Sequence, residues 1–234
     1  MVDRPASHAH ARAARVDAPL PGGIRALIFD SDGTLVDSEG LSAAVLAEVV
    51  AEHGVEVGEA EMLERSRGFK FADFMARLRA DYPALEGVDV EDPFRKRSLD
   101  AFRARLRPIA GAVELVRALP VDFCVASNGM RLKIETCLRT VGLLEAFEHR
   151  IVSAYEVGAW KPDPRLITHA AHVMRVPVAE CLLVEDSVPG ATAGLEAGTR
   201  VFGLAGVDYG ALATHPRFTQ VASMHEVAER LGLG

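Results

Sequence analysis

Charged and hydroxyl side chains follow four apolar segments of strand length in this sequence. Asp30 and Asp32 follow IRALIF, and Ser127 ends DFCVAS. Lys161 lies beyond RIVSA, and Glu185 with Asp186 follows CLLV. In an open parallel sheet, the reactive crevice lies outside the carboxyl ends of the strands. Because unpaired buried charge is costly, we expect a metal ion, the lysine and an anionic substrate to gather around these acids.

Phosphoryl transfer is the chemistry that this set of side chains fits. Mg2+ prefers carboxylate oxygens and bridges protein to phosphate. Asp30, Glu185 and Asp186 can supply the oxygens, with the backbone carbonyl of Asp32 within reach. One aspartate can also attack phosphorus and form an aspartyl-phosphate. We therefore predict a Mg2+ site beside a carboxylate nucleophile.

The remaining side chains suit the transferred phosphoryl group. Ser127 lies at the start of a predicted helix, where backbone N–H groups can hold phosphate oxygens. Lys161 can offset the charge that develops on the transferring group. Asp32 is placed to protonate the leaving oxygen and later to deprotonate water. Taken singly, Ser127 could be only a helix cap and Lys161 only a surface charge, but their joint placement at successive strand ends favours a site.

Short apolar runs alternate with longer amphipathic ones from residue 24 onward. We expect strands in IRALIF, DFCVAS, RIVSA, CLLVE and RVFGLA, and helices in GAVELVRAL, MRLKIETCLRTVGLL, PRLITHAAHVMR and VPGATAGLEAG. Strands that alternate with helices predict an α/β fold with a doubly wound parallel sheet. Small residues such as Gly190 and Gly194 would let the last of these helices pack closely on the sheet.

Residues 38–107 break this alternation, because they show helical periodicity without a convincing strand. We predict an all-helical cap domain at 38–107, inserted into a core domain of residues 24–37 and 108–234, with hinges at VDSEG and RPIAGA. Residues 1–23 lack the apolar stretch of a secretory signal. They are predicted to form a disordered N-terminal extension.

Composition narrows the possible partners. The formal net charge of -7 disfavours a general nucleic-acid binder, and no apolar run approaches the ~20 residues that cross a bilayer. Cys124, Cys137 and Cys181 have no metal-ligand spacing and favour free thiols in a reducing cytoplasm. We therefore expect a cytoplasmic protein that acts on a small phosphorylated metabolite, without an obligate protein partner.

The motifs resemble those of the haloacid dehalogenase superfamily of phosphatases, in the β-phosphoglucomutase-like subgroup with a helical cap. DSDGTLVDSE, SNG, WKPDP and VEDS match its four motifs in order, within a resemblance that covers residues 24–234. The resemblance implies a Rossmann-like core, Mg2+, and phosphorylated sugars or sugar acids as substrates. Ser31 stands where the family often carries a bulkier apolar residue, but that position offers mainly its backbone.

The resemblance also implies a role for each matched residue. Asp30 would be the nucleophile and Asp32 the acid and base. The phosphate would be bound by Ser127, Asn128 and Gly129, the third motif would supply Lys161, and the metal-site acids would be Glu185 and Asp186.

Three functions remain open at this point. The leading interpretation is a Mg2+-dependent phosphomonoester hydrolase acting on a small sugar phosphate or sugar acid phosphate. A β-phosphoglucomutase-like phosphotransferase would use the same aspartyl-phosphate, and a non-catalytic binding protein would keep only the fold. Substrate choice is expected to come from the cap, where Arg67 and Lys70 could meet a second anionic group. Ordinary surface cations would explain these two residues equally well.

Overall fold

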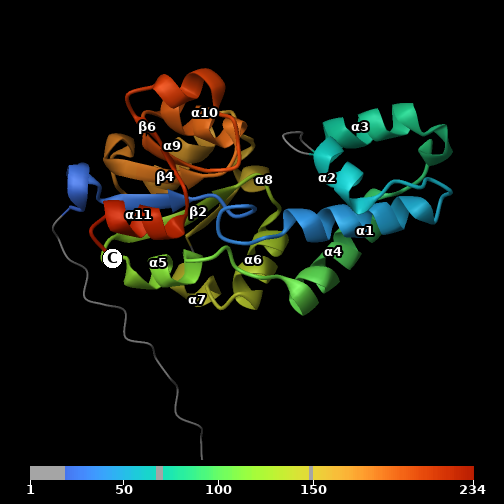
Figure 1. The fold of residues 1–234 in the computed structure, drawn as a ribbon, viewed down its shortest axis with the longest axis horizontal. Coiled ribbons are helices and arrows are strands. Elements are labelled where there is room, and N and C mark those ends of the chain that lie inside the picture. The colour runs from blue at the N-terminus through green and yellow to red at the C-terminus, as the bar shows by residue number, and fades with distance from the viewer. Residues whose placement is uncertain (1–18, 67–70, 148–149) are drawn as a thin grey trace, which may run out of the picture.

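A six-stranded parallel sheet forms the centre of the computed structural model, which describes residues 19–66, 71–147 and 150–234 (Figure 1). The strands are β1 (Ala26–Phe29), β2 (Asp122–Ser127), β3 (Ile151–Ser153), β4 (Cys181–Glu185), β5 (Arg200–Leu204) and β6 (Phe218–Val221). The first five coincide with the predicted strands, so the expected α/β fold is confirmed. The sixth was not predicted, because four residues at the edge of the sheet give too short a pattern.

The strand order β3-β2-β1-β4-β5-β6 places β1 in the middle of the sheet. The chain winds from β1 to β3 on one side and then crosses to β4 on the other, so the order reverses between β1 and β4. Phe29 of β1 pairs with Val184 of β4. The next residues, Asp30 and Glu185, therefore emerge side by side at the point where such sheets bind ligands.

Helices cover both faces of the sheet (Figure 1). The longer helices of the core are α5 (Ala112–Ala118), α6 (Arg131–Thr140), α9 (Arg165–Met174), α10 (Val188–Ala197) and α11 (Met224–Arg230), and the short ones are α7 (Leu144–Phe147) and α8 (Ala154–Val157). Leu27 and Phe29 pack in one apolar cluster with α5, α6, α7 and α11, while Ala26 and Ile28 pack in another with α9 and α10. This alternation is the period of two expected for a strand that is buried on both faces.

Four helices between β1 and α5 form what we call the α1–α4 unit, which lies beside the sheet core in Figure 1. They are α1 (Glu39–Ala51), α2 (Glu59–Ser66), α3 (Phe71–Asp81) and α4 (Glu91–Arg105). The unit has its own apolar cluster, in which Val49, Met62 and Leu78 are fully buried. Short 3-10 helices complete the fold at Pro21–Gly23, Pro83–Leu85, Val178–Glu180 and Gly210–Thr214.

The two connections between the core and the α1–α4 unit run side by side. Val36 forms an antiparallel bridge with Pro108. The N–H of Asp37 donates to the Arg107 carbonyl at 3.0 Å, and the N–H of Ile109 donates to the Leu35 carbonyl at 3.0 Å. Both connections therefore leave the core at one place, next to the carboxyl end of β1.

The predicted disordered extension does not reach residue 23. Leu20 is buried in the same cluster as Leu27, and its backbone bonds to Ile24 in both directions. Apolar burial thus orders residues 19–23, whereas residues 1–18 lie outside the described part of the chain. The three cysteines are free and buried. Over the described ranges, no helix has the length and apolar character to cross a membrane.

Candidate active site

A buried ammonium joins two strand ends at the centre of the sheet. The Lys161 ammonium donates to Oδ1 of Asp30 and, at 2.7 Å, to Oε2 of Glu185. All three residues are almost fully shielded from solvent. Although burial disfavours the ammonium, the two carboxylates hold the pKa of Lys161 above its usual range. Lys161, Asp30 and Glu185 therefore lie in direct contact, as their positions in the sequence predicted.

Three acids lie together at this point. Oxygen atoms of Asp30, Glu185 and Asp186 are all within 4.8 Å of one another. The first two share Lys161, whereas Asp186 accepts a hydrogen bond from the Thr34 hydroxyl at 3.1 Å. Three carboxylates around one ammonium leave an excess of negative charge in a poorly solvated place.

Two of the three acids, Asp30 and Asp186, have raised pKa values, as expected where nearby positive charge does not balance the carboxylates. Burial, followed by Glu185 and Asp30, raises the pKa of Asp186 to about 9. Burial raises the pKa of Asp30 to about 7 in spite of the opposing effect of Lys161. A hard divalent cation with oxygen ligands would relieve this cost. The acids therefore fit Mg2+.

Asp186→Asn is expected to stabilise the metal-free protein and to weaken its response to Mg2+. In EDTA, at pH values between the usual pKa of 3.8 and the raised pKa values of Asp30 and Asp186, the folded state binds more protons than the unfolded state. The wild-type melting temperature should therefore fall as pH rises from about 4 to about 9. The variant lacks the larger shift, so its Tm near pH 8 should exceed that of the wild type by about 3 °C or more.

Thermal unfolding with and without Mg2+ measures both effects. Asp100→Asn is the matched control, because Asp100 is an exposed acid of α4 that pairs with Arg103. Equal Tm values for wild type and Asp186→Asn in EDTA would show that Asp186 is not under electrostatic strain.

Backbone and hydroxyl donors fix Glu185. Its Oε1 accepts hydrogen bonds from the Ser187 hydroxyl at 2.8 Å and from the N–H groups of Asp186 and Ser187 at 3.1 Å each. A Cβ on Gly190 would lie 2.0 Å from Oε2 of Glu185. The glycine in the first turn of α10 therefore lets the helix pack closely against the end of β4, as predicted, and leaves space for the Glu185 carboxylate.

Asp32 is held apart from the three acids. Its Oδ2 accepts a hydrogen bond from the Lys133 ammonium at 2.8 Å, and its Oδ1 accepts one from the Ser38 hydroxyl. Burial alone would raise the pKa of Asp32, but Lys133 and Ser38 outweigh it and lower the pKa. The Asp32 carboxylate is not one of the clustered ligands, so its backbone carbonyl alone stays a predicted metal ligand.

Sequence reasoning did not identify Lys133 or Ser38. Lys133 follows Ser127 by six residues, within the first turn of α6, and Ser38 precedes α1. Lys133 does not directly follow a strand, and a single lysine inside a helix has no pattern that distinguishes it from a surface charge. The spacing of six residues between Ser127 of the SNG motif and Lys133 is the sequence feature that could have identified Lys133.

The SNG motif contributes in two ways. The Ser127 hydroxyl oxygen accepts a hydrogen bond from the Gly129 N–H at 3.0 Å, which leaves its proton free to be donated. Asn128 instead contacts the backbone of Lys161: its Oδ1 accepts from the Lys161 N–H at 2.8 Å, and its Nδ2 donates to the Lys161 carbonyl at 3.5 Å. In this structure Asn128 therefore braces the lysine segment, and its predicted contact with phosphate stays a prediction.

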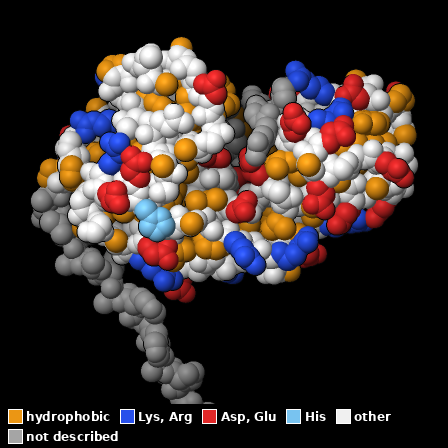
Figure 2. Space-filling view, viewed as in Figure 1, with side chains coloured by type: hydrophobic (Ala, Val, Ile, Leu, Met, Phe, Trp, Pro, Cys, Tyr) orange, Lys and Arg blue, Asp and Glu red, His pale blue; other side chains and the backbone are white. Residues whose placement is uncertain are grey.

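The surface is hollowed where the sheet core meets the α1–α4 unit, and Figure 2 shows Asp and Glu side chains along this boundary. Arg67 and Lys70, predicted to read the substrate from the cap, lie outside the described residues. Their role stays a prediction.

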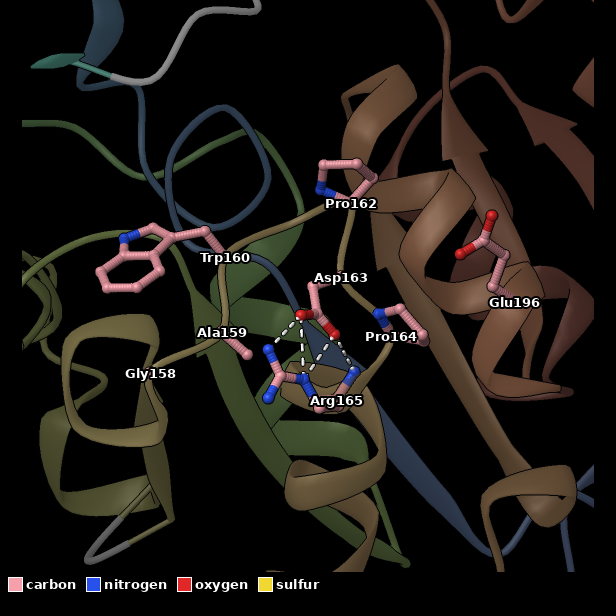
Figure 3. A pocket seen from close by; sticks show the side chains of 8 residues that line it. All are labelled: Gly158, Ala159, Trp160, Pro162, Asp163, Pro164, Arg165 and Glu196. Carbon is pink, nitrogen blue, oxygen red and sulfur yellow. Dashed lines mark hydrogen bonds and ion pairs between the residues drawn. The ribbon is translucent and has the colours of Figure 1, made fainter. Parts of the chain in front are cut away.

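A separate open hollow of about 500 Å³ lies beside the lysine segment (Figure 3). Its lining residues are Gly158, Ala159, Trp160, Pro162, Asp163, Pro164, Arg165 and Glu196. Arg165 forms an ion pair with Asp163 at 2.6 Å, and the Trp160 ring points away from this pair. Lys161 and the three clustered acids are not part of the lining. The chemistry therefore identifies the site better than the size of a hollow does.

Comparison with known proteins gives a consistent result. The model of the haloacid dehalogenase-like hydrolase family matches residues 24–198. The 6-phosphogluconate phosphatase of Escherichia coli (strain K12) is 32% identical over 207 residues, which cover 88% of this chain and 94% of that protein.

Solved structures agree with the family match. A HAD family hydrolase from Deinococcus radiodurans R1, with bound phosphate and sodium, is 33% identical with a TM-score of 0.71 and covers 90% of this chain and 97% of its own. A putative β-phosphoglucomutase from Thermotoga maritima has a TM-score of 0.73 over 89% of this chain and 99% of its own. At 21% identity, the second likeness concerns the fold alone.

Proposed function

Because the chain belongs to the haloacid dehalogenase-like hydrolases, we propose that it is a Mg2+-dependent phosphatase acting on a small sugar phosphate or sugar acid phosphate. The observation that carries this proposal is the buried Lys161 between Asp30 and Glu185, with Asp186 beside them. This arrangement holds a nucleophilic carboxylate next to a cation and to ligands for a metal. It is suited to the attack of one anion on another.

Asp30 is the proposed nucleophile. One of its oxygens is held by Lys161, which fixes the orientation of the carboxylate. The carboxylate forms a bond to phosphorus while the bond from phosphorus to the sugar oxygen breaks. Asp32 must enter this step protonated, although Lys133 and Ser38 lower its pKa in the free protein, and it donates that proton to the departing oxygen. Water then attacks phosphorus in the aspartyl-phosphate, Asp32 accepts its proton, and inorganic phosphate leaves with Asp30 restored.

The phosphate oxygens have three sources of stabilisation on the chain. Ser127 can donate its hydroxyl proton, and the Lys161 ammonium can offset the charge on the transferring group. Mg2+ bound to Asp30, Glu185 and Asp186 would supply positive charge that lets the anionic nucleophile approach the anionic phosphate.

Substrate selection is assigned to the α1–α4 unit, as a cap formed by residues 38–107. Its two connections leave the core beside Asp32, so a movement of the unit would open or close the site. Arg67 and Lys70 are proposed contacts for a second anionic group of the substrate. The likeness to a 6-phosphogluconate phosphatase supports a sugar acid phosphate, and three free buried cysteines agree with a cytoplasmic setting.

Release of inorganic phosphate tests the proposal. Wild-type protein is given a panel of sugar phosphates that includes 6-phosphogluconate and, as its matched neutral-sugar control, glucose 6-phosphate. We expect release with Mg2+, loss of release in EDTA, and preference for the sugar acid. No release from any member of the panel in the presence of Mg2+ would overturn the hydrolase. Turnover that needs a catalytic amount of a sugar bisphosphate would show a mutase instead.

A further inference from the structure

Lys133 lies where the core, the Asp32 carboxylate and the α1–α4 unit meet. Its ammonium is 2.8 Å from Oδ2 of Asp32 and 5.5 Å from the ring centroid of Phe102 in α4. Ser38, at the start of α1, holds the other oxygen of Asp32. Asp32 is therefore fixed from two sides by residues for which the proposed reaction assigns no role.

Two lysines form ion pairs with three of the four acids of the site. Within the described part of the chain, Lys161 forms ion pairs with Asp30 and Glu185, and Lys133 forms one with Asp32. Asp32 follows Asp30 by only two residues and already interacts with the Lys161 charge. Without Lys133, Lys161 would be the remaining ammonium near Asp32, and Asp32 would compete for it with the nucleophile.

We propose that Lys133 is a positioning residue, which keeps the Asp32 carboxylate away from the Lys161 cluster and in place for proton exchange with the leaving oxygen and with water. This inference rests on the proposed function and adds to it the residue that places the acid and base.

Stability does not account for the pair. The side chains of Lys133 and Asp32 are 31% and 25% exposed, and partly solvated ion pairs contribute little to folding. The Lys133 ammonium also lies over the ring of Phe102, and the thioether of a methionine at this position can replace that contact with a sulfur–aromatic one. Lys133→Met should therefore melt within about 2 °C of the wild type.

Comparison of two substrates distinguishes a positioning role of Lys133 from other roles. A sugar phosphate has a poor leaving group, which needs a proton from Asp32, whereas p-nitrophenyl phosphate has a good one, which does not. For Lys133→Met we expect kcat/KM to fall on the order of a hundredfold with the sugar phosphate and to stay within about threefold of wild type with p-nitrophenyl phosphate. KM for the sugar phosphate should change little, and Lys133→Arg should restore most of the rate.

Controls keep the test specific. Lys96→Met removes an exposed lysine that pairs with Asp92 on α4 and should leave both rates unchanged. In an Asp32→Asn background, Lys133→Met should cause no further loss with either substrate, because both changes act through one group.

Equal losses of kcat/KM with both substrates would overturn the inference. So would a further loss in the Asp32→Asn background, or a rise in KM confined to substrates with a second anionic group, because Lys133 would then contact the substrate itself. Failure of the proposed function looks different, since wild-type protein would then release no phosphate from either compound.

Discussion

Asp30→Asn is expected to abolish phosphate release from every substrate, with a loss of kcat of at least about ten-thousandfold. An amide of nearly the same shape can accept a hydrogen bond from Lys161, but it cannot form the bond to phosphorus. The fold should survive, because Lys161 keeps its contact with Glu185 at 2.7 Å. The neutral side chain also removes the cost of burying the Asp30 carboxylate.

Two measurements check this result. Phosphate release is compared between wild type, Asp30→Asn and the exposed control Asp100→Asn, which should keep full activity. Mass spectrometry of protein quenched during turnover should find a phosphoryl group on wild type at Asp30 and none there on the variant. Residual activity of more than a few per cent in Asp30→Asn, with no contamination by wild type, would exclude Asp30 as the nucleophile.

Lys161→Met should cause the largest loss of stability among single changes at the site. The Lys161 side chain is 3% exposed, and its ammonium is shared by Asp30 and Glu185. Removal of one partner from a buried ion pair leaves charge without compensation and costs about 3–5 kcal/mol in the free energy of unfolding. Catalysis should be lost as well, because the transferring phosphoryl group would lack this cation.

Urea unfolding in EDTA measures the loss, with Lys96→Met as the matched surface control. Excess Mg2+ should recover part of the stability of Lys161→Met, since a divalent cation supplies the missing positive charge. The double variant with Glu185→Gln should be less destabilised in EDTA than Lys161→Met alone, because one uncompensated carboxylate is gone. A free energy of unfolding within about 0.5 kcal/mol of wild type for Lys161→Met would contradict the structural role of the ammonium.

The sequence by itself determined five of the six strands of the sheet and most of the carboxylate cluster. Continuous apolar runs of strand length specify buried parallel strands, and the residues that follow such strands meet at one edge of the sheet. Asp30, Lys161 and Glu185 could therefore be placed together from their positions alone, since each follows or ends a predicted strand. The helices of the described residues between 38 and 107 were equally plain, because periodicity is a local property of the chain.

Only the tertiary structure decided which partner each acid takes. Lys133 and Asp32 are 101 residues apart, and no local pattern relates a lysine in α6 to the end of β1. The fold also brings the backbone of Lys161 to the amide of Asn128, a contact that the sequence did not indicate. Packing of helices on the sheet sets such distances, and it depends on the whole core. Spacing along the chain thus identifies the edge of the sheet where the chemistry lies, and the packed fold distributes the charges within it.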